Sequence, residues 1–129
     1  MSVDRSTVST ADAPEAIGPY SQAVISGGLL FCSGQIPLDP ASAEISGADP
    51  SEQATRCLQN LEAVCAAAGT TLASSLRLTV YTTELAEFAA INDAYSAFFE
   101  DAPPARTAVE VSALPKGALV EIDAIVAVP

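Results

Sequence analysis

The sequence predicts one α+β domain in which a mixed sheet carries two helices on one of its faces. Three observations support this. Strand-like and helix-like segments follow in the order two or three strands, helix, strand, helix, two strands. Only two segments are long and amphipathic enough to cover a sheet, so the second sheet face stays open and an oligomer is expected. At 129 residues, the chain can bury roughly two thirds of its unfolded surface in one core.

The chain begins with a polar segment, residues 1–12, which we expect to be flexible, ahead of a single domain at residues 13–129. That segment lacks the apolar core and the cleavage pattern of a signal peptide, so a cytoplasmic location is the default expectation. A lead-in with two prolines and a glycine follows and ends at Tyr20. Tyr20 either caps the core or lines a site.

A hairpin is predicted next. Residues 21–26 and 29–33 are short strand-like runs, and the glycines at 27–28 suit a tight turn. The second run leads into Ser33 and Gly34. This pair is either a β-bulge or an ordinary strand end, or it is a place where a ligand approaches the backbone closely beside a hydroxyl group.

The two predicted helices are Pro50–Ala68 and Leu85–Glu100. The first has Asp49 as its N-cap and Gly69 as its stop signal, and its apolar residues recur at spacings of three and four. On the apolar face of the second helix lies Asn92. Its amide either bonds to a nearby helix end or loop, or faces a pocket.

Three further strands are predicted at residues 76–82, 106–113 and 119–127. Arg106 follows two prolines that oppose helix continuation, and Glu121 is an acid on a strand otherwise suited to burial. An arginine at a strand end is usually part of a surface ion pair of little energetic worth. Alternatively, the arginine grips a carboxylate in two hydrogen bonds while the glutamate positions a water.

Composition excludes several classes of protein. The chain has no histidine, which removes Ser-His-Asp and Cys-His catalysis and every histidine-ligated metal site. A net charge of −11 with five dispersed basic residues argues against a nucleic-acid partner. Three cysteines without CxxC spacing predict small buried side chains rather than disulfides or a zinc site. No apolar run approaches the ~20 residues that span a bilayer.

Five phrases in the sequence resemble the reactive intermediate deaminase family, also called the YjgF or UK114 family. Each phrase alone is weak, but their order is that of the family, and the resemblance covers the chain from about residue 13 to residue 128. The phrases are AIGPYSQAV (16–24), SGQIPLDP (33–40), NDAY with FF (92–99), PAR (104–106), and LPKG with VEI (114–122).

The resemblance implies a chorismate-mutase-like fold, assembled as a homotrimer with sites in the clefts between subunits. It implies that Arg106 binds the substrate carboxylate and that Glu121 holds the attacking water. No metal or cofactor is implied. Four other residues fall on positions that line the same cleft: Tyr20, Ser33, Gly34 and Asn92.

The activity implied by the resemblance is hydrolysis of 2-imino acids or their enamine tautomers, such as 2-iminobutanoate and 2-iminopropanoate, to 2-oxo acids and ammonia. A protonated imine carbon is already electrophilic, so positioning supplies much of the catalysis. The alternatives are an aminoacrylate deaminase and a module that binds a small carboxylic or 2-oxo acid without turnover. An RNA-cleaving or translation-inhibiting role is disfavoured by the charge.

Two positions depart from some family members. Ala108 stands where these carry a cysteine, which excludes thiol chemistry there, and Arg77 stands where they carry a lysine. Arg77 conserves only the charge, so we assign it no function.

The separation of the two proposed catalytic residues is a further expectation. If the last two strands form a hairpin with their polar side chains on one open face, Arg106 and Glu121 lie roughly 13 to 20 Å apart. A three-carbon imino acid cannot bridge that distance. Either the strands are not a simple hairpin, or the two residues of one site come from different subunits. We favour the second interpretation.

Overall fold

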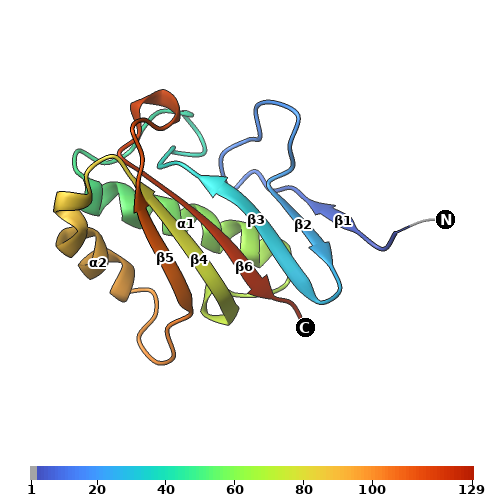
Figure 1. Ribbon diagram of the computed structural model, residues 1–129. Helices are drawn as coiled ribbons and strands as arrows, with labels where there is room; N and C mark the ends of the chain where they lie inside the picture. Colours follow the sequence, from blue (N-terminus) through green and yellow to red (C-terminus); the bar gives the residue numbers. More distant parts are fainter. Residues whose placement is uncertain (1–2) are drawn as a thin grey trace.

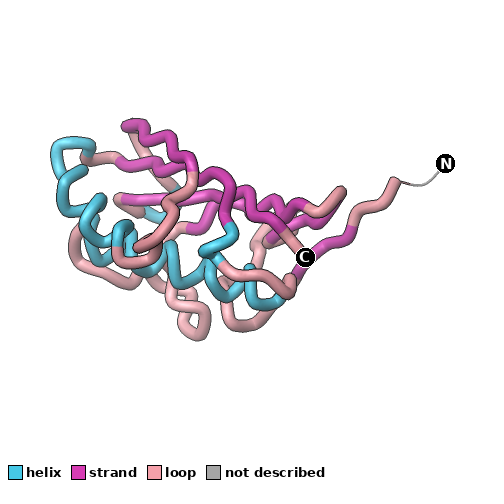
Figure 2. Tube along the Cα trace, turned by 90° about the horizontal axis from the view of Figure 1, so that it is seen from below, coloured by secondary structure: helices cyan, strands magenta, loops and turns pink. Residues whose placement is uncertain are grey.

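The computed structural model describes residues 3–129 and contains one mixed sheet with two α-helices on the same face (Figures 1 and 2). The order of strands across the sheet is β1-β2-β3-β6-β4-β5. β4 and β5 are parallel, and all other pairs are antiparallel. The predicted α+β fold is therefore confirmed. The elements are β1 (Ser6–Val8), β2 (Ala23–Ser26), β3 (Leu29–Gln35), α1 (Pro50–Ala67), β4 (Ser75–Thr82), α2 (Phe88–Ser96), β5 (Ala105–Glu110) and β6 (Val120–Ala127).

Helix α1 begins where its capping signal predicts. The side chain of Asp49 accepts a hydrogen bond of 2.8 Å from the backbone N–H of Glu52, and Pro50 occupies the first turn. The apolar stripe of this helix is completely buried against the sheet. The two helix cysteines lie in that stripe, and all three cysteines of the chain are free and buried, as predicted.

Helix α2 is shorter than the predicted Leu85–Glu100 segment. A 3-10 turn at Leu85–Glu87 precedes it, and the α-helix proper ends at Ser96. The side chain of Glu110 accepts a hydrogen bond of 3.0 Å from the backbone N–H of Leu85, so the entry to this helix is bound to the end of β5. A tertiary contact therefore shapes this boundary.

The N-terminal segment contains an edge strand that the sequence analysis did not predict. Residues 6–8, within the segment expected to be flexible, pair with residues 23–25 of β2. Within residues 3–129, none of the helices is both long and apolar enough to cross a membrane.

The hairpin assumed for the last two strands is wrong, because β4 lies between β5 and β6. Arg106 is aligned with Leu78 of β4, whereas Glu121 is aligned with Tyr81 of the same strand. Residues paired directly across a sheet point to the same face. Leu78 is buried under the helices and Tyr81 is not. Arg106 therefore points to the helix side, and Glu121 points to the open side.

This correction also reverses the two faces of β5. The period-two alternation of residues 106–113 predicts Val109 on the core face, but Val109 is 38% exposed on the open face. Ala108, its neighbour, packs against the core instead. β5 is an edge strand and ends at Glu110 rather than Ala113, so its alternation carried little information on burial.

Asn60 on α1 is completely buried and holds the chain that follows β3. Its Nδ2 atom donates hydrogen bonds to the carbonyl oxygens of Ile36, at 3.3 Å, and Leu38, at 3.0 Å.

Replacement of Asn60 by leucine leaves both carbonyls without these donors. We expect Asn60→Leu to lower the free energy of unfolding by about 1–3 kcal/mol in urea denaturation. The matched change at exposed Gln59 of the same helix, Gln59→Leu, should change it by less than about 0.5 kcal/mol. Equal effects of the two substitutions would contradict this role.

Candidate functional site

Gly34 and Glu121 meet at a bulge in β3. The register of β3 against β6 shifts between Cys32 and Gln35, so the bulge predicted as one alternative is present. A Cβ atom added to Gly34 would lie 2.9 Å from Cδ of Glu121 and closer still to its Oε2 atom. The carboxylate of Glu121 therefore lies directly against the backbone of Gly34. Any other residue at position 34 would displace that carboxylate.

Ser33, beside Gly34 in the bulge, ties β3 to the chain that enters β2. Its hydroxyl donates a hydrogen bond of 2.6 Å to the carbonyl oxygen of Ser21, and its backbone N–H donates to that of Gln22 at 3.0 Å. The Ser33 hydroxyl retains acceptor capacity for a ligand. In the structure, these two hydrogen bonds hold the residues that precede β2 against the bulge.

Tyr20 lies at the same end of the sheet. Its side chain is 52% exposed and, together with Gly34, lines a pocket of about 310 Å³ that also includes Ile36 and Lys116. Since Glu121 contacts Gly34, the predicted residues Tyr20, Ser33, Gly34 and Glu121 form one group. We call this group the Glu121 half-site.

The protonation of Glu121 is shifted by its surroundings. Partial burial, and to a smaller extent the negative charge of Asp123, raises the pKa of Glu121 above the usual value for a glutamate. Asp123 lies on the same face of β6 and accepts a hydrogen bond of 3.0 Å from the hydroxyl of Tyr81. A carboxylate with a raised pKa is a better proton acceptor than an ordinary one.

Arg106 and Asn92 form a second group at the edge of the sheet. Nη1 of Arg106 donates a hydrogen bond of 2.8 Å to Oδ1 of Asn92. The Arg106 guanidinium carbon also lies 5.1 Å from the ring centre of Phe88 and 4.8 Å from that of Tyr95, within the range of cation–π contact. These contacts from α2 orient the guanidinium, which has further N–H donors for a carboxylate. We call this group the Arg106 half-site.

The helical spacing of the apolar residues predicts Phe88 and Tyr95 on the apolar face of α2, but it does not predict their contact with Arg106. The available signal was their spacing from Asn92, four and three residues, which places all three side chains on one helix face. That Arg106 reaches this face could not be predicted while β5 was assigned the opposite orientation. Arg106 also lines a pocket of about 330 Å³ with Asn92 and Tyr95.

One protomer does not bring the two half-sites together. Arg106 and Glu121 lie on opposite faces of the sheet and on strands that flank β4. The residues of β4 with which they are aligned, Leu78 and Tyr81, are three positions apart. The backbones of Arg106 and Glu121 are therefore separated by about 14 Å. Across residues 3–129, no group of three or more cysteine, aspartate and glutamate residues is arranged to hold a metal ion.

Comparison with known sequences gives consistent matches along the chain. The family model described as Endoribonuclease L-PSP matches residues 10–128. A RutC family protein of Sinorhizobium fredii is 54% identical over 119 residues, which are 92% of this chain and 94% of that protein. The 2-iminobutanoate/2-iminopropanoate deaminase of Capra hircus is 43% identical over 124 residues, which are 96% of this chain and 90% of that enzyme.

Solved structures give the same result. A protein of the conserved Rid family from Yersinia pestis is 44% identical and superposes with a TM-score of 0.93 over 97% of this chain and 100% of its own. TdcF of E. coli, solved with bound serine, is 42% identical, with a TM-score of 0.90 over 96% of this chain and 99% of its own. A family model matches nearly the whole chain, and relatives of 43–54% identity align over at least 90% of both chains, so the chain belongs to the reactive intermediate deaminase family, the YjgF/RidA family.

Proposed function

We propose that this protein is a deaminase that hydrolyses small 2-imino acids and their enamine tautomers, such as 2-iminobutanoate and 2-iminopropanoate, to 2-oxo acids and ammonia. The observation that carries the proposal is the complementarity of the two half-sites. One presents a guanidinium oriented by Asn92 and two aromatic rings. The other presents a carboxylate held against Gly34. The name of the Capra hircus relative and the serine bound to TdcF support a small substrate of the amino-acid type.

The chemistry assigns one task to each half-site. Arg106 holds the substrate carboxylate in two charge-assisted hydrogen bonds. Glu121 accepts a proton from a water as the water oxygen attacks the imine carbon, which gives a tetrahedral carbinolamine. That proton then passes to the nitrogen. The C–N bond breaks and ammonia leaves, while the Glu121 carboxylate takes the hydroxyl proton as the carbonyl of the 2-oxo acid forms. The reaction consumes one water and requires no redox partner.

A complete site in this proposal needs a second subunit. Within one protomer, Arg106 and Glu121 lie on opposite faces of the sheet. The open face also exposes Phe31, at 45%, and Val109, at 38%, which suits contact with another copy of the chain. We therefore propose a homotrimer in which the Arg106 half-site of one subunit meets the Glu121 half-site of the next.

Other functions are less well supported by the same geometry. A module that binds a 2-oxo acid without turnover, or an aminoacrylate deaminase, would use the same Arg106 contact with a carboxylate. The description of the family model names an endoribonuclease. The net charge of −11, with five basic residues dispersed along the chain rather than gathered in one stripe, argues against nucleic-acid cleavage.

The proposal is tested by a coupled assay in which a threonine or serine dehydratase generates the imino acid. Added protein should hasten the appearance of the 2-oxo acid, because it accelerates a step that otherwise relies on bulk water. The acceleration should survive exhaustive chelation and should be absent with Arg106→Ala. Binding of 2-oxobutanoate by calorimetry without any acceleration would favour the binding module instead.

Glu121→Gln tests the role of the carboxylate as proton acceptor. The substitution keeps the size and hydrogen-bonding reach of the side chain but removes its negative charge. We expect kcat to fall by about 10²-fold or more, while KM changes little. A raised KM with intact kcat would instead make Glu121 a residue of substrate binding.

The pH dependence gives a second test of Glu121. The raised pKa means that the active carboxylate form is lost as the pH falls through a value higher than that of an ordinary glutamate. Activity of the unaltered protein should therefore begin to decline at a higher pH than it would if an ordinary glutamate were the proton acceptor. Asp123→Asn removes a neighbouring negative charge that raises this pKa, so the acid limb should move to lower pH. An unmoved limb would show that another group controls it.

Subunit mixing tests the shared site. Arg106→Ala and Glu121→Gln proteins, each inactive alone, are unfolded together and refolded. If each cleft takes its arginine and its glutamate from different subunits, random mixing leaves about a quarter of the clefts intact, and activity should recover to that extent. No recovery, although mass spectrometry shows mixed trimers, would place both residues in one subunit.

A further inference from the structure

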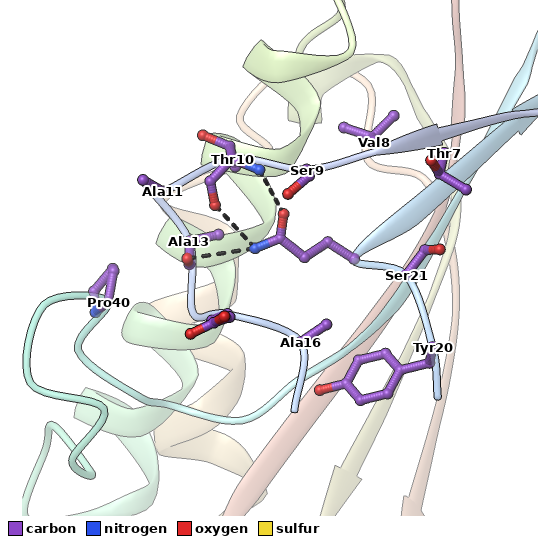
Figure 3. Close-up of a pocket in the computed structure, with 12 residues that line it drawn as sticks. Thr7, Val8, Ser9, Thr10, Ala11, Ala13, Ala16, Tyr20, Ser21 and Pro40 are labelled. Atoms are coloured by element: carbon purple, nitrogen blue, oxygen red, sulfur yellow. Dashed lines mark hydrogen bonds between the residues drawn. The ribbon is translucent and has the colours of Figure 1, made fainter. Parts of the chain in front are cut away.

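Gln22 is a buried amide whose polar atoms are all engaged by one loop. Its side chain is 4% exposed. Oε1 accepts a hydrogen bond of 2.7 Å from the backbone N–H of Thr10, and Nε2 donates to the carbonyl oxygens of Thr10 at 3.0 Å and Pro14 at 2.8 Å. Nε2 also lies 3.4 Å from the carbonyl oxygen of Ala13. Dashed lines in Figure 3 mark the bonds to Thr10 and Ala13.

This carboxamide takes the place of a missing strand partner. The ladder between β1 and β2 ends at the pair of Val8 and Ala23, after which the chain turns away from the sheet. Thr10 lies just beyond that end, yet both of its backbone groups are paired, because the Gln22 side chain offers an acceptor and a donor as a peptide group would. The bonds to Thr10 are part-buried and the bond to Pro14 is buried. Breaking them would leave backbone groups that are shielded from water without partners, so they hold the loop in this position.

The loop that Gln22 closes carries Tyr20. Both ends of residues 10–22 are joined through this one side chain, since Gln22 itself is the last residue of the loop. The Tyr20 ring is half-exposed, and its backbone N–H donates to the carbonyl oxygen of Gly18 at 2.9 Å. Gly18 has a φ of 127°, which favours glycine. The position of the Tyr20 ring therefore depends on the path of the loop rather than on packing in the core.

We propose that Gln22 is a positioning residue of the active site. By holding residues 10–14, its carboxamide places Tyr20 at the pocket that contains Gly34, against which the Glu121 carboxylate lies. Without these bonds the loop samples several positions, and only a fraction of molecules has the pocket preformed. Apparent substrate affinity falls by that fraction. The kinetic consequence rests on the proposed function, whereas the effect on Tyr20 does not.

The structural part is tested with protein in which tyrosine is replaced by 3-fluorotyrosine. The chain has three tyrosines, so three fluorine resonances are expected, and Tyr20→Phe identifies one of them. Gln22→Met keeps the length of the side chain and removes every hydrogen bond. It should shift or broaden the Tyr20 resonance while those of Tyr81 and Tyr95 stay in place. An unchanged Tyr20 resonance would overturn the proposal.

Gln53→Met is the matched control. Gln53 is also 4% exposed, but its amide bonds to Gly47 and Leu119, which do not line the Tyr20 pocket. The substitution should lower stability and leave the Tyr20 resonance unchanged. If it moved that resonance as much as Gln22→Met does, the effect would be general loosening and the proposal would fail.

Hydrogen exchange of the unaltered protein gives a test that does not depend on how a variant folds. The amide of Thr10, which lies outside the strand ladder but bonds to Gln22, should exchange much more slowly than that of exposed Ala11. Equal rates would show that Gln22 does not hold the loop in solution.

The kinetic part is measured in the coupled assay. Gln22→Met should raise KM by about tenfold and change kcat by less than about threefold, because the competent fraction falls while the chemistry within it is unaltered. A moved Tyr20 resonance with unchanged KM would make Gln22 a structural residue only. If the unaltered protein has no deaminase activity, the proposed function fails. The fluorine and exchange results still decide whether Gln22 positions Tyr20.

Discussion

The structure depends on the burial of one face of β6 against α1. Strand β6 lies inside the sheet, between β3 and β4, and its side chains alternate strictly between buried and half-buried. Burial of an aliphatic side chain such as Ile122 or Val126 contributes roughly 1.5–3 kcal/mol, so a slip of one residue would cost several such terms. This constraint leaves Glu121 on the open face. The bulge in β3 then brings the backbone of Gly34 against its carboxylate.

Buried amides hold the loops around this arrangement. Gln22 bonds to the loop before Tyr20, Gln53 to the residue that leads into β6, and Asn60 to the chain after β3. Each of the three amides is at most 4% exposed. A carboxamide carries both a hydrogen-bond donor and an acceptor. It can therefore pair with backbone groups of a loop, which have no partners in a helix or in a strand ladder. The loops near the Glu121 half-site are therefore ordered by side chains of the core.

The two half-sites differ in how their charges are stabilised. Arg106 stays at an exposed edge, where Asn92 and two aromatic rings orient it without removing it from water. Glu121 is half-buried beside another carboxylate, which raises its pKa. An exposed cation suits the capture of an anionic substrate, and a carboxylate with a raised pKa suits proton transfer. The division of chemical roles in the proposed reaction follows from this difference in environment.

Local signals in the sequence determined much of this protein. The capping residues of α1, the glycine pair between β2 and β3, and the alternation of β6 each depend on residues close together in the chain, and each was predicted. Absence of histidine likewise limited the chemistry to carboxylates, arginine, tyrosine, serine, backbone amides and water. The tertiary structure alone decided the strand order, which places β4 between β5 and β6. It thereby decided which face carries Arg106, because the polarity of an edge strand does not reveal its orientation, and pairing between distant strands leaves no local signal.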